Sequence, residues 1–369
     1  MKESKIGTIE AISLVLTIVV NHIILNLPKS IISSTASAAP LNIIFIGIIA
    51  FFISYLVYRL LKNFPNLDIL DISKFLGGKW LKNLIGVLFL LYFVCISSII
   101  LRTFCEALKI IYLQKVSISF IILLFIIAII IINKLGFKSM IRANLLIMPI
   151  ILFSIFFIFI ANIKNFTFQH IFPILGYGIV PTFLSGISNL FAFGGIAYLY
   201  FLPPSIDSKN LKKISIISIL TSVIFLFLSI TSLLFMFPFI GNTESIMPLY
   251  MAVRYIEFSR FFQRLDAVFL LLWIMSIIGY LSIVVSFSIY IFQKITNVQD
   301  SKPLVYCFSG IIFIISLIPK DMVQVRFLEN EVYKYLVLGL VFVISIILLI
   351  LANIKYKRLH KKEGDVLIE

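Results

Sequence analysis

The chain has 369 residues, of which 61% are hydrophobic and only 13% are charged. A soluble domain carries roughly a quarter charged residues, and a soluble globule of this length could not bury so much apolar surface. The composition therefore excludes a soluble protein and indicates an integral membrane protein. The formal net charge of +15 comes from basic residues in short connectors between apolar runs. We expect these residues to set the topology and to contact anionic headgroups of the lipid bilayer, not to bind nucleic acid.

Little in the chain resembles an enzyme site. Cys95, Cys105 and Cys307 lie in or at the ends of apolar runs and show no metal-ligand spacing. With three histidines and scattered acids, no acid, base or metal set converges in the sequence. We therefore expect no catalytic residues, no metal site and no cofactor.

The apolar runs are long enough to cross a membrane, which takes roughly 20 mostly apolar residues per helix. They predict ten spans in an all-α fold, within a single transporter-like domain that covers residues 1–369. The spans are expected at residues 8–32, 41–61, 84–111, 116–133, 143–163, 176–202, 212–238, 266–293, 303–319 and 332–354. Polar residues and a proline interrupt the first run, which is therefore interpreted as a retained span and not as a cleaved signal peptide.

Basic residues predict the orientation. Connectors on the side of the two termini carry most of the Lys and Arg residues, so both termini are expected to be cytoplasmic. The basic tail, residues 355–369, is expected to anchor the chain at the inner leaflet.

The two halves of the chain, approximately residues 8–163 and 176–354, show a corresponding layout. Each has a long connector after its second span, and each connector contains a candidate surface helix, Ile69–Phe75 or Met247–Phe262. Because each half has an odd number of spans, the halves must be inverted relative to one another. This pattern predicts the 5+5 inverted repeat of secondary transporters.

The first span of each half has the features of a broken helix. The first contains Asn21-His22 and then Asn26-Leu27-Pro28, and the sixth contains Pro181, Gly186 and the pair Gly194-Gly195. Pro and Gly are common in membrane helices, but two interruptions at matched positions favour a binding cavity between them. Backbone groups freed by such breaks are stable in the membrane only inside protein or beside a cavity.

Four groups of motifs carry a resemblance to a known family. They are Ile24-Leu25-Asn26-Leu27-Pro28; Phe64-Pro65-Asn66-Leu67 with Leu76-Gly77-Gly78-Lys79-Trp80-Leu81; Phe172-Pro173-Ile174-Leu175-Gly176-Tyr177-Gly178 with Phe201-Leu202-Pro203-Pro204; and Met247-Pro248-Leu249-Tyr250 with Gln263-Arg264-Leu265-Asp266 and Trp273-Ile274. In this order and spacing the chain resembles the B subunits of bacterial spore germinant receptors, the GerAB-type spore permease family. These proteins are relatives of the amino acid–polyamine–organocation transporters, so the resemblance implies a LeuT-like fold with broken helices 1 and 6.

The resemblance also implies a function. In that family the B subunit lies in the spore inner membrane beside an A subunit and a C-subunit lipoprotein. The resemblance implies that the chain binds a small germinant, often an amino acid, and triggers germination by sensing or ion release. The alternative is an autonomous secondary transporter (permease) for an amino acid or amine, which should show a coupling site such as a midplane acid.

The candidate ligand-binding residues lie around the expected breaks and on spans that face the cavity by resemblance. They are Asn21, His22, Ile23, Asn26, Tyr92, Ile96, Asn189, Phe193, Gly194, Gly195 and Tyr280. Two features depart from the related transporters. The stretch Val20–Ile24 has no glycine, and Ala197 stands where a glutamate is common, which disfavours proton-driven transport.

Three further groups allow two interpretations. His22 either couples protonation to conformation or packs as a neutral side chain. Arg102 with Glu106, spaced i, i+4, and Arg264 with Asp266 are expected to be structural or to contact another subunit and not to bind ligand, with anion binding by Arg102 as the alternative.

Overall fold

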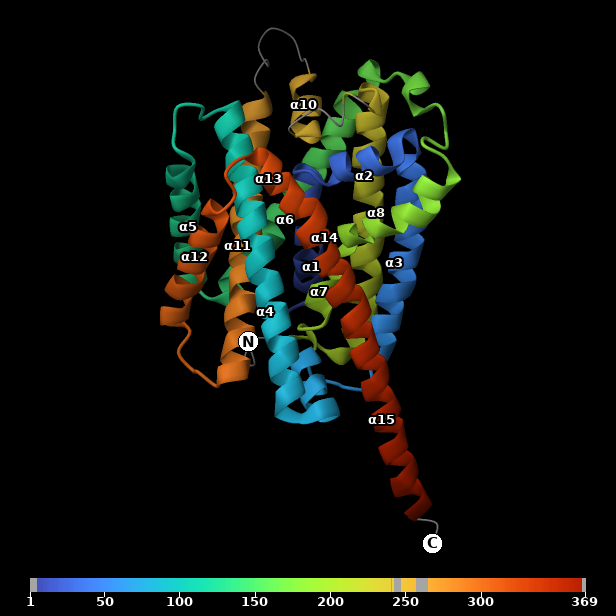
Figure 1. The fold of residues 1–369 in the computed structure, drawn as a ribbon, viewed down its shortest axis with the longest axis vertical. Coiled ribbons are helices and arrows are strands. Elements are labelled where there is room, and N and C mark those ends of the chain that lie inside the picture. The colour runs from blue at the N-terminus through green and yellow to red at the C-terminus, as the bar shows by residue number, and fades with distance from the viewer. Residues whose placement is uncertain (1–4, 240, 242–246, 257–264, 367–369) are drawn as a thin grey trace.

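The computed structural model describes residues 5–239, 241, 247–256 and 265–366, and its regular elements in these ranges are all helical (Figure 1). Six helices are long and apolar enough to cross a membrane: Leu27–Leu61, Ile69–Ile111, Phe137–Ala161, Ser208–Met236, Leu265–Thr296 and Met322–Leu359. Four shorter apolar helices accompany them: Thr8–Ile24, Ile118–Lys134, Val180–Phe193 and Lys302–Leu317. The prediction of an all-helical membrane protein is confirmed.

The first predicted span is broken. Helix α1 (Thr8–Ile24) ends at Leu25, whose φ of −85° and ψ of −113° are not helical, and α2 (Leu27–Thr35) begins directly after Asn26. Pro28 lies in the first turn of α2, where its missing N–H costs nothing. The break therefore lies at Leu25–Asn26, and Asn21-His22 remain inside the last turns of α1.

A second turn of the backbone separates a surface segment from a spanning helix in α4 (Ile69–Ile111). Asp68 caps the start of this helix by accepting hydrogen bonds from the backbone N–H groups of Leu70 and Asp71. Gly77 and Gly78 are not helical, and Gly78 has a φ of 72°, which glycine adopts without steric cost. The predicted surface helix Ile69–Phe75 thus forms the part of α4 that precedes this turn.

Six further helices lie at predicted spans and begin and end within a few residues of the predicted positions. They are α3 (Ala39–Leu61), α5 (Ile118–Lys134), α6 (Phe137–Ala161), α8 (Leu211–Met236), α11 (Leu265–Thr296) and α12 (Lys302–Leu317). The second predicted surface helix, Met247–Phe262, is represented by α10 (Pro248–Arg254), and its residues 257–262 lie outside the described part of the chain. Short connecting turns are η1 (Ala36–Ala38), η2 (Ile163–Asn165), η3 (Phe168–Ile171), η6 (Pro203–Ser205) and η7 (Ser208–Asn210).

The sixth predicted span is irregular throughout its length. A π-helical turn η4 (Val180–Leu184) passes into a 3₁₀ segment η5 (Ser185–Phe193), and α7 (Ile196–Leu199) follows after Gly194-Gly195. The predicted interruption at the glycine pair is therefore present.

The last span starts earlier than predicted, at Met322 and not at residue 332. It runs through α13 (Met322–Phe327), the π-helical η8 (Leu328–Tyr333), α14 (Lys334–Leu336), the π-helical η9 (Val337–Ile344) and α15 (Ser345–Val366). Glu329 and Asn330 fell in the connector predicted before residue 332, but in the fold they lie on the helix. The correction matters because it places Glu329 inside the bundle, where only 5% of its surface is exposed.

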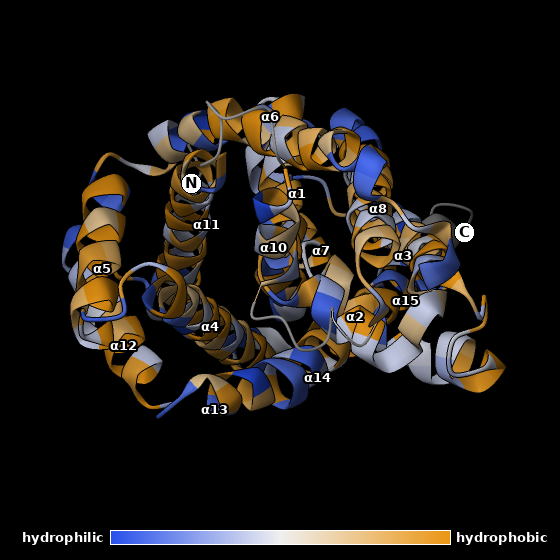
Figure 2. Cartoon of the chain, turned by 90° about the horizontal axis from the view of Figure 1, so that it is seen from above, coloured by the Kyte–Doolittle hydropathy of each residue, from blue (hydrophilic) through white to orange (hydrophobic). Residues whose placement is uncertain are grey.

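The broken helices lie in the interior of the bundle. Helix α1 packs against α6, α8 and α11, and α7 also contacts α1. Figure 2 shows α1 and α7 near the middle of the molecule, with α5 and α12 at one edge and α3, α8 and α15 at the other. Outward-facing side chains are large and apolar, for example Phe52, Leu146 and Phe153, as expected of a surface in contact with lipid tails.

Candidate functional site

The two broken helices approach each other closely at the glycine pair. A Cβ atom on Gly195 would lie 2.5 Å from the backbone oxygen of Val15 in α1. A Cβ atom on Gly194 would lie 3.2 Å from the hydroxyl of Tyr333. Glycine at these positions therefore lets the sixth span lie against α1 and leaves the Tyr333 hydroxyl close to the break.

His22 lies between two tyrosines from different spans. Its ring stacks on Tyr333 with centroids 5.0 Å apart and meets the edge of Tyr280 at 6.2 Å. The His22 side chain is buried and its Nε2 atom has no hydrogen-bond partner among the described residues. The arrangement positions a ring nitrogen beside two hydroxyl-bearing rings.

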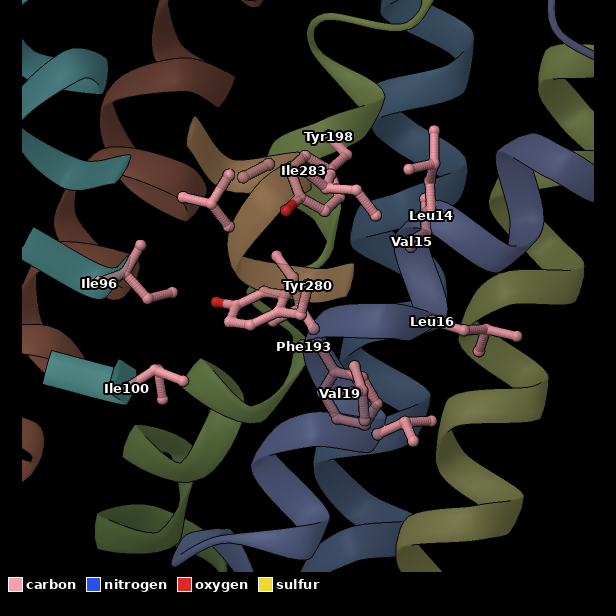
Figure 3. Close-up of a cluster of buried hydrophobic side chains, with 14 of the residues drawn as sticks. Leu14, Val15, Leu16, Val19, Ile96, Ile100, Phe193, Tyr198, Tyr280 and Ile283 are labelled. Carbon is pink, nitrogen blue, oxygen red and sulfur yellow. The ribbon is translucent and has the colours of Figure 1, made fainter. Parts of the chain in front are cut away.

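Four buried tyrosines form a cluster, called here the tyrosine cluster: Tyr92, Tyr198, Tyr280 and Tyr333. The His22 ring contacts both Tyr280 and Tyr333, and the Phe93 ring contacts both Tyr92 and Tyr198. In Figure 3 the Tyr280 ring lies between Tyr198 and Phe193, and its hydroxyl points toward the side of α4 that carries Ile96.

Several polar atoms around this cluster are buried without a hydrogen-bond partner in the described part of the chain. They are the hydroxyls of Tyr92, Tyr198 and Tyr280, Nε2 of His22, and Oδ1 of Asn21 and Asn26. An unsatisfied buried polar group costs about 1–3 kcal/mol. Six such atoms around two broken helices therefore indicate a site at which a ligand or water supplies the missing hydrogen bonds.

Asn26, in the first break, contacts the only acid found beside the site in the described residues. Its Nδ2 donates to Oε2 of Glu329 at 2.9 Å. Glu329 lies four residues before Tyr333 in the same helical segment, a spacing that brings side chains together on one face. A carboxylate therefore lies next to the tyrosine cluster.

The other predicted site residues divide into two groups. Ile23, Ile96 and Phe193 are buried apolar side chains, and Figure 3 shows Ile96 and Phe193 on two sides of Tyr280. Asn189 lies in a separate polar network: its Nδ2 bonds to Oδ1 of Asn42 at 2.9 Å and to the hydroxyl of Ser34 at 3.0 Å. Asn42 in turn donates to backbone oxygens of Thr182 and Gly186. Asn189 thus links the sixth span to α2 and α3.

The two charged clusters predicted to be structural have different partners. Arg102 pairs with Glu106 at 2.7 Å inside the bundle and also donates to the backbone oxygen of Ser316 in α12. Asp266 accepts hydrogen bonds from the hydroxyls of Tyr112 and Tyr250, whereas Arg264 lies outside the described residues. Neither Arg102 nor Asp266 is part of the tyrosine cluster.

Three residues of the site escaped the sequence analysis: Tyr198, Tyr333 and Glu329. The signal for Tyr198 was its position directly after Ala197, beside the glycine pair. For Glu329 and Tyr333 the signal was their spacing of four residues, which brings side chains together on one helical face. Across the described chain, no group of three His, Cys, Asp or Glu residues is placed to hold a metal ion.

Fold and site together define a helical membrane protein built like a transporter. The structure matches a Na+-coupled sialic acid symporter in its substrate-bound outward-open state, with a TM-score of 0.66, 13% identity, and coverage of 92% of this chain and 80% of the symporter. It also matches Mhp1, a nucleobase-cation-symport-1 family transporter in a closed conformation, with a TM-score of 0.61, 10% identity, and coverage of 93% and 78%. At these identities the likeness establishes the fold alone.

The sequence identifies the family. Residues 5–325 match the family model described as "Spore germination protein" (Spore_permease), so the chain belongs to this family. It is 23% identical to the Spore germination protein YndE of Bacillus subtilis over 361 residues, covering 95% of this chain and 97% of that protein. It is also 26% identical to Spore germination protein A2 of the same organism over 209 residues, covering 56% and 57%. The resemblance inferred from the motifs is confirmed.

Proposed function

We propose that the chain is the membrane-embedded B subunit of a spore germinant receptor and that it binds a small germinant, an amino acid or similar molecule, at the tyrosine cluster. Six buried polar atoms without a described partner, on the two broken helices and on α4 and α11, carry this proposal. Each of these atoms is available to a polar ligand, and each would gain a hydrogen bond on binding.

The proposed ligand lies between α1, α7, α4, α11 and the last span. Asn21, His22 and the tyrosine hydroxyls supply uncharged donors and acceptors, and Glu329 with Asn26 supplies a site for an ammonium group. The apolar wall of the proposed site consists of Ile23, Ile96 and Phe193. Gly194 and Gly195 leave room for the ligand at the break in the sixth span.

The proposal includes the setting that the family membership suggests. The chain would lie in the spore inner membrane with both termini cytoplasmic, in ten spans arranged as a 5+5 inverted repeat. It would act with A and C subunits of the receptor and trigger germination when the ligand changes the relation between the broken helices.

A second function, autonomous secondary transport of an amino acid or amine, is favoured by Glu329. The sequence offered no acid at the breaks, but the structure supplies a buried carboxylate that bonds to Asn26. Buried acids within spans are the usual sites of ion or proton coupling in transporters. The two candidate functions therefore share one site and differ in whether the ligand crosses the membrane.

Binding and uptake by the purified chain test both functions. A panel of amino acids and amines is screened for ligands that raise the unfolding temperature, since a ligand that binds only the native state stabilises it. A ligand whose effect disappears in Tyr280→Phe supports the proposed pocket, and no effect from any panel member contradicts ligand binding by this subunit alone. Uptake of that ligand into liposomes containing only this chain favours transport, and binding without uptake favours the receptor function.

A further inference from the structure

A basic pocket lies at the end of the bundle that carries both termini, away from the tyrosine cluster. It has a volume of about 140 Å³ and lies between the turn at Gly77-Gly78 in α4 and the end of α11. Its lining residues are Lys74, Lys79, Lys82, Asn83, Ile295 and Asn297. Three ammonium groups and two side-chain amides thus line one small pocket, and none of its lining residues is acidic.

The nearby acids are already paired with another lysine. Lys294 in α11 forms ion pairs with Asp68 at 2.6 Å and with Asp71 at 2.5 Å. Tyr290 also donates to Asp68 at 2.6 Å. Lys294 offsets one of the two negative charges of Asp68 and Asp71, so less negative charge remains there than the three lysines of the pocket carry in positive charge.

The lysines around the pocket differ in their partners. Lys355, from α15, donates to the backbone oxygens of Phe75 and Leu76, at the end of the surface segment. Lys82 donates to the backbone oxygen of Lys294 at the end of α11. Lys74 and Lys79 are exposed and have no ion pair or hydrogen bond in the described residues, so their charge is available to an anion.

The pocket lies where the polar surface of α4 gives way to its lipid-facing surface. Trp80, 74% exposed, adjoins Lys79. An exposed tryptophan beside basic residues is typical of the headgroup level of a bilayer. From Asn83 the same face of the helix continues through Val87, 47% exposed, to Leu91, 51% exposed, at spacings of four residues. An acyl chain lying along Val87 and Leu91 would therefore place its headgroup at the lysines.

We propose that this pocket binds the phosphate of an anionic phospholipid headgroup. Lysine ammonium groups bind phosphate oxygens as point charges, and the apolar strip below the pocket distinguishes a lipid from a free anion. The bound lipid would bridge the surface segment of α4 and the end of α11, next to the ion pairs of Lys294.

The test compares two variants with equal loss of charge. In Lys74→Gln/Lys79→Gln both substituted side chains are exposed and lack described partners, so the fold is expected to persist. Lys212→Gln/Lys213→Gln is the control, because these lysines are exposed at the start of α8 and are not among the residues that line the basic pocket. Each protein, checked for monodispersity, is titrated with phosphatidylglycerol, with phosphatidylcholine and with inorganic phosphate, and its unfolding temperature is measured.

Phosphatidylglycerol is expected to stabilise the wild type and the control equally. The pocket variant is expected to need about 30-fold more of the lipid, because its two lysines together contribute about 2 kcal/mol to the binding of anionic lipid. Equal responses of all three proteins would overturn the proposal, as would equal stabilisation by phosphatidylcholine. If inorganic phosphate stabilises the wild type as much as phosphatidylglycerol does, the pocket binds a soluble anion and the proposal of a lipid site is overturned. If the double variant does not fold, Lys79→Gln alone replaces it.

Discussion

Asn26 and Glu329 are 303 residues apart in the chain, yet Nδ2 of Asn26 lies 2.9 Å from Oε2 of Glu329. The first residue occupies the break between α1 and α2, and the second lies in the π-helical segment η8 of the last span. This hydrogen bond joins the first and last spans beside the tyrosine cluster. It leaves Oδ1 of Asn26 without a partner, so the pair is held in place and still offers an acceptor to a ligand.

Glu329→Gln should weaken the binding of ligands that carry an ammonium group by about 10- to 100-fold, because a hydrogen bond to a charged group contributes about 1.5–3 kcal/mol. Glutamine keeps the size of the side chain and an acceptor oxygen for Asn26, so the unfolding temperature without ligand should change little. Ligand-dependent unfolding temperatures measure both quantities.

Glu331→Gln is the matched control, because it removes the same charge from an exposed residue two positions along the last span. A variant at Glu329 that binds the ligand as tightly as the control would contradict an ammonium site at this carboxylate.

Removal of single tyrosine hydroxyls separates ligand contacts from structural ones. The Tyr280 hydroxyl is buried without a described partner, whereas the Tyr200 hydroxyl donates to the backbone oxygen of Val341 at 2.7 Å. Tyr280→Phe should therefore leave the ligand-free protein as stable as the wild type or more stable, and should weaken ligand binding. Tyr200→Phe should lower the free energy of unfolding by about 1 kcal/mol and leave ligand binding intact.

Thermal unfolding with and without ligand gives both results for each variant. The same effect on binding from both substitutions would mean that the Tyr280 hydroxyl has no special relation to the ligand.

Much of the fold could be predicted from the sequence because lipid imposes a length and a composition on each spanning helix. Pro28 and the pair Gly194-Gly195 also predicted where two helices are interrupted. The first break lies at Leu25–Asn26, a few residues beyond the predicted Asn21-His22, because a proline fits the first turn of a new helix.

The acid of the site could not be predicted in the same way. Charged residues lower the hydropathy of a window, so the last span was predicted to begin at residue 332 and Glu329 was left in the connector before it. In the folded chain Asn26 supplies a hydrogen bond to Glu329, and that contact depends on two segments at opposite ends of the sequence. Tyr198 and Tyr333 were missed because tyrosine in a span is commonly an interfacial or packing residue.

Substitution by alanine should affect stability differently at the two glycines of the second break, Gly194 and Gly195. A Cβ atom on Gly195 would lie 2.5 Å from the backbone oxygen of Val15, and neither helix can yield without a shift of its backbone. On Gly194 the nearest atom would be the Tyr333 hydroxyl at 3.2 Å, at the end of a side chain.

Gly195→Ala should therefore lower the free energy of unfolding by about 1–3 kcal/mol, as overpacking does, and should separate α7 from α1. Gly194→Ala should be tolerated in stability and should alter the ligand response through Tyr333. Equal loss of stability in the two variants, measured by chemical unfolding, would argue against the close approach of α7 to α1.

The ion pairs at the other end of the bundle should be important for stability. Asp68 is fully buried, caps α4, and accepts from both Lys294 and Tyr290. Asp68→Asn should lower the free energy of unfolding by about 2 kcal/mol, somewhat less than the loss of a fully buried pair, because Asp71 remains as a partner for Lys294.

Asp207→Asn provides the comparison, because the pair of Asp207 with Lys5 is long, at 3.5 Å, and its two side chains are 63% and 87% exposed. Such surface pairs contribute little to stability, so no measurable change is expected. If Asp68→Asn unfolds at the same denaturant concentration as Asp207→Asn, the contact of the α4 surface segment with α11 does not stabilise the fold. A selective loss in Asp68→Asn would establish that Lys294 holds the surface segment of α4 against α11, which fixes one wall of the basic pocket.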